Sequence, residues 1–293
     1  MLILKSSGRE DYSLLDTGDG YRLEKFGKYT ISRPDPNVIW EKTLDKSHWE
    51  NVDAVFLKNE DGKWSWKIKN KNLPERREMK YQNLKFRAKL TSFRHTWVFP
   101  EQHLNRDWLT SNIERWKKGK MEKCKVLNLF WYTGIASVAC SMAWAEVTHI
   151  DASYPSLTWT KDNEKLTWCK NFIRALPDDV MKFIDKEIRR WVKYDWIIMD
   201  PPVYGHGVKW EVRRFEDDFP KLLQKTKLIL TDKPLFILIN AYATTISSFT
   251  LNNILSEITK DLGWKSEFWE LVLEEKSAKR LLSTGIYARR SFS

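Results

Sequence analysis

Residues 125–134 constrain the fold of this chain more than any other stretch. The first half is a compact apolar run containing Val126, Leu127 and Leu129, which is typical of a strand buried on both faces of a parallel sheet. The second half ends in Thr133-Gly134, where glycine allows the backbone to turn tightly into a helix. Because free N–H groups at a helix N-terminus attract anionic groups, the stretch predicts one wall of a site for a nucleotide-like cofactor.

Two later segments end in acidic residues. Residues 146–151 indicate a second buried strand that ends in Asp151, and residues 194–199 indicate a third that stops at Asp200-Pro201-Pro202. Two successive prolines cannot continue a strand ladder, so the chain leaves the sheet there. In folds of this kind a carboxylate at the end of the second strand hydrogen-bonds ribose hydroxyls. We therefore expect these strand ends to lie together at one edge of the sheet.

Four motifs occur in a fixed order along the chain. They stand at residues 127–134, 151–153, 178–183 and 200–204. Together they resemble the class I S-adenosylmethionine-dependent methyltransferases, and most of all the bacterial group that modifies large-subunit ribosomal RNA. The resemblance extends from about His95 to the C-terminus. It implies an α/β fold, with a Rossmann-like, seven-stranded, mostly parallel sheet in residues 93–293 and a small antiparallel β domain in residues 1–92.

The resemblance also implies which residues contact S-adenosylmethionine. We expect Asp151 to accept hydrogen bonds from both ribose hydroxyls, for which a carboxylate is suited; alternatively, it caps the next helix. Asp179, or its neighbour Asp178, would accept from the adenine amino group or instead cap a helix. Asn128 is expected to fix the turn, and a segment with His95 and Glu101 to approach from the side. The full expected set is Gln102, Asn128, Phe130, Tyr132, Thr133, Gly134, Asp151, Ser153, Asp178 and Asp179.

The target site is expected at Asp200, Pro201, Pro202 and Tyr204. Methyl transfer from a sulfonium needs mainly alignment of the reacting atoms. Asp200 and the loop carbonyls can accept hydrogen bonds from a base edge, and Tyr204 offers a stacking surface; the alternative is a rigid loop with an aromatic core anchor. Methylation at cytosine C5 needs a cysteine nucleophile, and none lies near Asn240. Transfer to a base nitrogen is therefore favoured.

Composition limits the partners. A formal charge of +11 and a pI near 9.4 indicate an acidic partner, most commonly nucleic acid; with the resemblance, ribosomal RNA is expected. The three cysteines have no metal-ligand or disulfide spacing, which predicts no metal site and fits a reducing cytoplasm. No apolar run is long enough to span a membrane.

Two alternatives to an RNA methyltransferase stay open. The first keeps the fold and changes the substrate to a small molecule or a protein. The second is a catalytically silent RNA-binding protein with the same fold, because the indole of Trp131 stands inside the cofactor turn and could block it.

Tryptophan is unusually abundant, with sixteen residues against eleven glycines. In the family that the chain resembles, six of these positions hold glycine or another small residue. They are Trp97, Trp131, Trp144, Trp196, Trp210 and Trp269. We hypothesise that the suspect codons are UGA, read as glycine in the source cell and written here as Trp; the alternative is a protein that is simply rich in Trp.

The remaining chain predicts the order of elements. Residues 11–89 indicate antiparallel strands, with a hairpin at Gly18-Asp19-Gly20 and exposed turns over residues 58–78. The C-terminal part alternates helices and strands, which implies a mostly parallel sheet. Helices are expected at residues 105–117, 135–143, 156–165, 181–190 and 248–261, and further strands at 172–176, 235–239, 267–273 and 285–290.

Overall fold

The computed structural model describes residues 4–6, 10–91, 96, 98–118, 120–130, 132–169, 173–202, 204–206, 212–242 and 245–291. The chain forms two compact units. The larger unit comprises Asn105–Glu270 and Gly285–Ser293, with Met1–Leu2, and the smaller comprises Ile3–Leu104 and Leu271–Thr284. The sequence predicts a domain boundary between residues 92 and 93, and this boundary stays a prediction. The smaller unit extends to Leu104 and also includes Leu271–Thr284.

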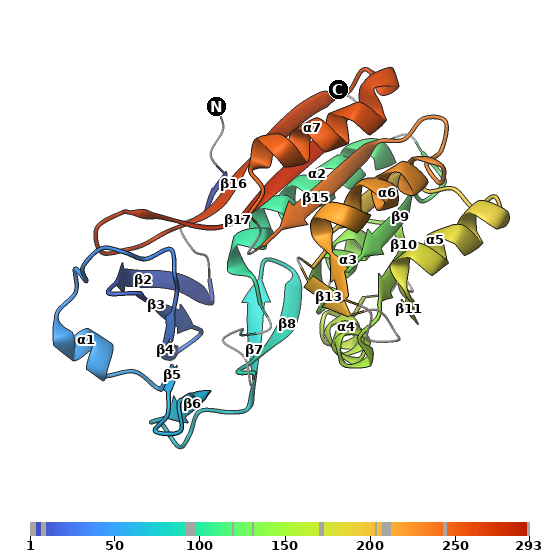
Figure 1. Ribbon diagram of the computed structural model, residues 1–293. Coiled ribbons are helices and arrows are strands. Elements are labelled where there is room, and N and C mark those ends of the chain that lie inside the picture. Colours follow the sequence, from blue (N-terminus) through green and yellow to red (C-terminus); the bar gives the residue numbers. More distant parts are fainter. Residues whose placement is uncertain are drawn as a thin grey trace. The chain divides into compact units, whose positions relative to one another are not determined.

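The larger unit is built on parallel strands with helices on both faces (Figure 1). Its strands are β9 (Lys125–Leu129), β10 (Glu146–Asp151), β11 (Ile173–Pro177), β12 (Trp196–Met199) and β15 (Phe236–Ala241), and its helices are α2 (His103–Lys117), α3 (Ile135–Met142), α4 (Tyr154–Leu166), α5 (Val180–Arg189), α6 (Phe215–Lys227) and α7 (Ser248–Thr259). The whole sheet also includes β1 (Leu4–Ser6), β16 (Lys265–Glu274) and β17 (Leu281–Ser291), and its order is β1-β16-β17-β15-β12-β9-β10-β11. The antiparallel strand beside β15 is β17 (Leu281–Ser291). This is the mostly parallel, Rossmann-like arrangement that the sequence predicts.

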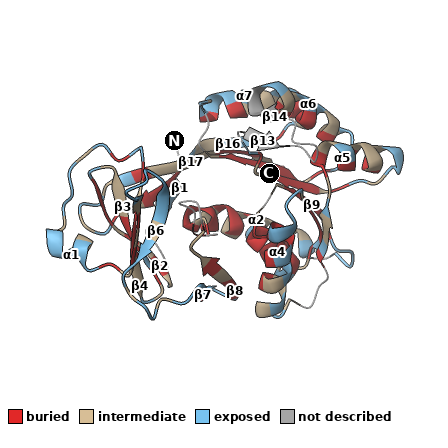
Figure 2. Ribbon diagram, turned by 60° about the horizontal axis from the view of Figure 1, so that its bottom comes forward, coloured by how far each residue is buried: buried red, intermediate tan, exposed pale blue. Residues whose placement is uncertain are grey.

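Side chains of the central strands alternate between two helical layers. Leu127, Ile197 and Ile237 face the apolar core that α5, α6 and α7 complete. The intervening residues face the opposite layer, where Trp108 of α2 packs on Phe236. Figure 2 shows α5, α6 and α7 on one side of this sheet and α2 and α4 on the other. Strands buried on both faces explain the continuous apolar runs in the sequence.

Three helices of this unit end in the same way. After α3, α4 and α5 the chain enters the left-handed region at Trp144, Trp168 and Trp191, with φ of 91°, 55° and 56°. At each end, two backbone N–H groups turn back to the last helical carbonyls; for α4, Trp168 donates to Lys165 and Cys169 to Glu164, both over 3.1 Å. This is the Schellman arrangement, whose left-handed position is normally glycine.

The other tryptophans at positions where glycine or a small residue was expected do not lie at left-handed helix ends in the described part of the chain. Trp196 is buried in β12 and its ring lies 4.2 Å from that of Phe236, and Trp269 lies in β16 (Lys265–Glu274). Neither has a positive φ. Trp97, Trp131 and Trp210 lie outside the described residues.

The smaller unit contains a five-stranded sheet and a separate hairpin. The sheet has the order β2 (Tyr12–Gly18), β3 (Tyr21–Phe26), β4 (Tyr29–Pro34), β5 (Ala54–Lys58) and β6 (Trp64–Ile68), and the short helix α1 (Lys46–Glu50) lies between β4 and β5. The hairpin pairs β7 (Arg76–Tyr81) with β8 (Leu84–Lys89). The predicted turn at residues 18–20 is confirmed by the β2–β3 pairing.

The structure corrects several local expectations. The sheet is not wholly antiparallel, because β4 pairs with β5 in parallel across the α1 connection. Residues 58–78 are not all turns, since they include β6 and the start of β7. The large sheet gains an eighth strand, β1 (Leu4–Ser6), parallel to β16. A short hairpin of β13 (Tyr204–His206) and β14 (Val212–Arg214), and helix α6, follow β12.

Candidate active site

Four parallel strands of the larger unit end at one level. Leu129 of β9 is in register with Ile150 of β10 and with Met199 of β12, and Asp151 is in register with Pro177 of β11. The next backbone N–H groups continue the ladder, because Phe130 donates to Ile150 over 3.0 Å and Asp200 donates to Leu129 over 3.2 Å. The turn after β9, Asp151, Asp178 and Asp200 therefore follow adjacent strand ends at a single sheet edge.

The turn between β9 and α3 is held in an unusual backbone conformation. Phe130 and Tyr132 have φ of 61° and 38°, which non-glycine residues rarely adopt, and Gly134 has φ of 69°. A Cβ at Gly134 would lie 2.3 Å from Oγ1 of Thr160 in α4. The close approach of α4 and the positive φ both require glycine there. Strain of this kind is concentrated at functional sites.

Asp151 organises this turn from the neighbouring strand. Its Oδ2 accepts a hydrogen bond from the Tyr132 N–H over 3.1 Å, and its Oδ1 accepts one from the Ser153 N–H over 2.8 Å. Burial raises the pKa of the Asp151 carboxyl to about 6, against the lowering effect of these two bonds. Each oxygen keeps a second lone pair, so the carboxylate can accept from two hydroxyl groups of a ligand.

Three of the predicted cofactor residues, Asp178, Asp179 and Ser153, form helix caps or an ion pair within the protein. Asp179 is the N-cap of α5, and its Oδ1 accepts from the Lys182 N–H over 3.0 Å. Asp178 forms an ion pair with Lys186, with 2.6 Å between Oδ2 and Nζ. Ser153 caps α4 in the same manner, through a bond of 3.4 Å from the Ser156 N–H. The cap that the sequence offered as the alternative for Asp179 is therefore present.

Asn128 lies beneath the turn and faces α3. Its Nδ2 donates to Ser137 Oγ over 2.7 Å, and that hydroxyl lies 2.9 Å from Nδ1 of His149 in β10. Burial lowers the pKa of His149 to about 4, so its imidazole is neutral at physiological pH. The three side chains tie β9, α3 and β10 together. Thr133 is fixed from α4, since its carbonyl accepts from Asn163 Nδ2 over 3.0 Å.

The loop after β12 leaves the sheet as expected. Pro201 is buried and Pro202 is exposed at the end of the strand. The backbone of Tyr204 begins β13, while its side chain lies outside the described part of the chain. The proline pair therefore stands at the rim of the sheet edge that carries Asp151.

A buried network of hydrogen-bonded side chains, which the sequence did not predict, ends beside Asp200. Because Met199 pairs with Ile239, Asn240 is the residue of β15 that neighbours Asp200. Arg289 donates from Nη1 to Asn105 Oδ1 over 3.3 Å, and Asn105 Nδ2 donates to Asn240 Oδ1 over 2.7 Å.

Arg289 fixes the direction of the hydrogen bonds in this polar network. A guanidinium can only donate, so it sets the orientation of the Asn105 amide and, through it, that of Asn240. The Asn240 Nδ2 is left as a fully buried donor with no partner among the described residues. Such a donor is costly unless a ligand completes it. Strand register brings Asn240 next to Asp200, and the motif at Asn240 indicated only that no cysteine stands there.

The remaining predicted residues belong to the smaller unit or lie outside the description. Gln102 and Glu101 are buried in the short helix η1 (Pro100–Gln102), and burial raises the pKa of Glu101. His95 lies outside the described residues. Their expected role at the cofactor stays a prediction.

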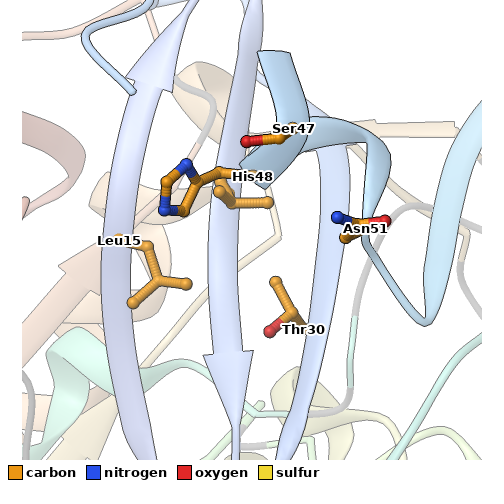
Figure 3. A pocket seen from close by; sticks show the side chains of 6 residues that line it. Leu15, Thr30, Ser47, His48 and Asn51 are labelled. Carbon is orange, nitrogen blue, oxygen red and sulfur yellow. The ribbon is translucent and has the colours of Figure 1, made fainter. Parts of the chain in front are cut away.

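The smaller unit contains a pocket of its own. This cavity of about 230 Å³ lies between α1 and the strands β2, β3 and β4. Figure 3 shows His48, Ser47 and Asn51 above Leu15 and Thr30.

Metal and membrane sites are not found where the structure can be described. Within these ranges, no three His, Cys, Asp or Glu side chains gather closely enough to hold a metal ion. Among the same residues, no helix is long and apolar enough to cross a bilayer.

Comparisons with known proteins agree on one family. Residues 64–259 match the S-adenosylmethionine-dependent methyltransferase family. The crystal structure of a SAM-dependent methyltransferase from Agrobacterium tumefaciens is 35% identical, with a TM-score of 0.92 over 99% of this chain and 93% of that one. A putative SAM-dependent methyltransferase from Streptococcus mutans shares the fold at 16% identity, with a TM-score of 0.71 over 96% of this chain and 76% of that one.

Among curated proteins, the ribosomal RNA large subunit methyltransferase K/L of Shewanella baltica is 31% identical over 141 residues. The match covers 46% of this chain and 17% of that protein. The chain thus spans about one sixth of the length of the curated relatives that it matches.

Proposed function

Because the chain belongs to the S-adenosylmethionine-dependent methyltransferase family, we propose that it transfers a methyl group from S-adenosylmethionine to a base nitrogen of ribosomal RNA. The observation that carries the proposal is the common level of four strand ends, with the β9 turn tied to Asp151 at one side and Asp200 at the other. The proposed setting is the cytoplasm, where ribosomal RNA is methylated in bacteria.

The described residues fit the donor. Asp151 has lone pairs for two ribose hydroxyls, and it lies beside the turn whose Tyr132 N–H it holds. Asp179 caps α5 through Oδ1, and the proposal assigns its carboxylate to the adenine amino group. Asn128 supports the turn from below. The donor supplies an activated methyl carbon, and these side chains orient it.

The target nitrogen is placed in this proposal at Asp200-Pro201-Pro202. The nitrogen lone pair forms the new bond to the methyl carbon while the carbon–sulfur bond breaks and its electrons stay on sulfur. The nitrogen becomes more acidic as it is methylated, so its proton can pass to an acceptor. Asp200 is the acceptor beside the rim, and the buried Asn240 amide donates to a base oxygen or nitrogen that faces it. Both groups align the base, which is the main requirement of the reaction.

Tritiated methyl transfer tests the proposal. The purified protein is incubated with tritiated S-adenosylmethionine and with large-subunit ribosomal RNA from a strain that lacks the gene. Incorporation is expected in the wild type and should fall at least 100-fold in Asp200→Ala, since a positioned acceptor contributes about that much. Mass spectrometry of nuclease digests then identifies the base. Incorporation into protein but not RNA would refute the RNA substrate, and donor binding without any transfer would leave a silent RNA-binding protein.

A further inference from the structure

The β7–β8 hairpin of the smaller unit separates its side chains sharply by face. The face that packs inward carries Arg77, Met79, Tyr81, Leu84, Phe86 and Ala88, all buried. The other face carries Arg76, Glu78, Lys80, Lys85, Arg87 and Lys89, which are exposed or half-buried. We call this second face the basic ribbon. It presents five cations and one carboxylate on two extended strands.

Like charges stand directly opposite each other on the basic ribbon. The register pairs Arg76 with Lys89 and Lys80 with Lys85, and only Glu78 faces a cation of opposite sign, Arg87. Directly opposed like charges destabilise an antiparallel pair. Lys89 also lies 2.5 Å from the carboxylate of Glu75. The face thus carries a clear excess of positive charge, which suits an anionic partner.

The shape and chemistry of the face indicate which anion. Alternate residues on each strand are about 6.8 Å apart, which is comparable to the spacing of successive phosphates along an extended nucleic acid strand. No large apolar side chain shares the exposed face, because all the apolar residues of the hairpin point inward. Membrane-binding surfaces insert apolar groups beside their cations, and protein interfaces rely on buried apolar anchors. The ribbon offers neither.

We propose that the basic ribbon binds the phosphate backbone of the RNA substrate. This rests on the proposed function, and assigns the smaller unit the task of holding the RNA by charge while the larger unit reads and methylates a base. Contacts to phosphate carry no sequence information, so the ribbon would set affinity and leave the choice of base to the larger unit.

The variant Lys80→Gln/Lys85→Gln tests the ribbon. Binding of a fluorescein-labelled fragment of large-subunit ribosomal RNA is followed by anisotropy at several KCl concentrations. Losing two phosphate contacts should lower the slope of log affinity against log salt by roughly 1.4–1.8 and weaken binding roughly tenfold. The matched control is Lys46→Gln/Lys221→Gln, which removes the same charge from exposed positions on α1 and α6. Its slope should equal that of the wild type.

Thermal unfolding supplies a second signature. Since Lys80 and Lys85 repel each other across the ladder, their replacement should leave the melting temperature unchanged or raise it slightly while RNA affinity falls. An unchanged salt slope in the ribbon variant overturns the proposal, as does an equal loss in the control. A ribbon variant that loses affinity for phosphatidylglycerol vesicles but not for RNA overturns it in favour of a membrane surface.

Failure of the ribbon and failure of the methyltransferase proposal are separable. Unaltered RNA binding by the variant, with methyl transfer intact in the wild type, rejects the ribbon alone. Loss of salt-dependent binding in the variant, with no methyl transfer by the wild type, supports the ribbon and rejects the proposed reaction.

Discussion

Asp151 and Tyr132 are joined by a hydrogen bond in which the Tyr132 backbone N–H donates to Asp151 Oδ2 over 3.1 Å. The acid at the end of β10 therefore holds the strained turn that follows β9, where Tyr132 has φ of 38°. One carboxylate both shapes the turn and faces the sheet edge at which we place the donor. Loss of this side chain should disturb the backbone of the turn as well as remove an acceptor.

Replacement of Asp151 by Asn should weaken binding of S-adenosylmethionine roughly 10- to 100-fold, because hydrogen bonds to a charged acceptor contribute about 1.5–3 kcal/mol. In the wild type, affinity should fall as the pH drops below about 6, where the carboxyl becomes protonated. The Asn variant should lack this dependence. Calorimetry between pH 5 and 8 measures both effects; equal affinity of the two proteins at pH 8 would contradict the ribose assignment.

The raised pKa of Asp151 also predicts a trend in stability. The folded protein retains a proton that the unfolded chain releases between the ordinary value of 3.8 and about 6. The contribution of this group to the free energy of unfolding is therefore full below pH 3.8 and is lost as the pH rises through 6. Urea unfolding of the wild type and of Asp151→Asn across this pH range measures the effect. The free energy of unfolding of the wild type should fall relative to that of the variant as the pH rises.

Replacement of Asn240 by Ala should lower kcat/KM for RNA methylation about 10- to 100-fold while leaving donor affinity unchanged, since its buried amide donor neighbours Asp200 rather than Asp151. Asn112→Ala is a suitable control, because that amide bonds only within α2 and its neighbourhood. Steady-state kinetics with RNA measures the effect on catalysis, and calorimetry with S-adenosylmethionine measures the effect on donor binding. A change in donor affinity with normal kinetics would place Asn240 at the cofactor instead.

Replacement of Gly134 by Ala should destabilise the protein and abolish donor binding. The new Cβ meets Thr160 at 2.3 Å, and the φ of 69° adds strain of about 1–2 kcal/mol. Thr160→Ala removes the two nearest atoms and should restore part of the stability but not the strain. A double-mutant cycle by thermal unfolding measures this coupling; strictly additive effects would show that the two residues do not collide.

Glycine at position 144, 168 or 191 should stabilise the protein by about 1 kcal/mol each, because these helix ends hold a non-glycine residue at positive φ. The indoles of Trp168 and Trp191 are 82% and 84% exposed, so little packing is lost with them. Alanine at the same positions removes the indole but keeps the strain, and should not stabilise. Equal melting temperatures for the Gly and Ala variants would contradict the backbone argument.

Trp168 and Trp191 extend the codon hypothesis, because they take the same left-handed helix-end position as Trp144. If the source cell reads UGA as glycine, the gene should carry UGA at codons 168 and 191, as well as at the six positions suspected from the sequence. UGG at these codons, or an organism that reads UGA as tryptophan, refutes it.

Sequence patterns were most informative where strands are buried on both faces. The ends of β10 and β12 were predicted because their apolar runs stop at Asp151 and Asp200. Strand β6 was missed although Trp64, Trp66 and Ile68 alternate with two polar residues, because it is short and stands in a mostly polar stretch. Helix α6 was not predicted, and its internal Pro220 is a poor helix signal.

Contacts between distant segments could not be read from the chain. Asn240 and Asn105 meet only because α2 packs on the face of β15 to which Asn240 points. Similarly, Asp16 of β2 accepts from Ser277 and Arg280, and no local pattern pairs these residues. Local sequence specifies elements, whereas register and packing specify which polar groups complete one another.

The return of Leu271–Thr284 to the smaller unit has a consequence for synthesis on the ribosome. Strand β1 finds its parallel partner only in β16, and Arg280 donates to the carbonyl of Thr17. The first hundred residues thus leave the ribosome with β1 unpaired and with the Thr17 carbonyl lacking its Arg280 donor until residues 271–284 have been translated. A nascent chain that terminates before residue 271 would lack both partners, so its amino-terminal part could not complete its fold.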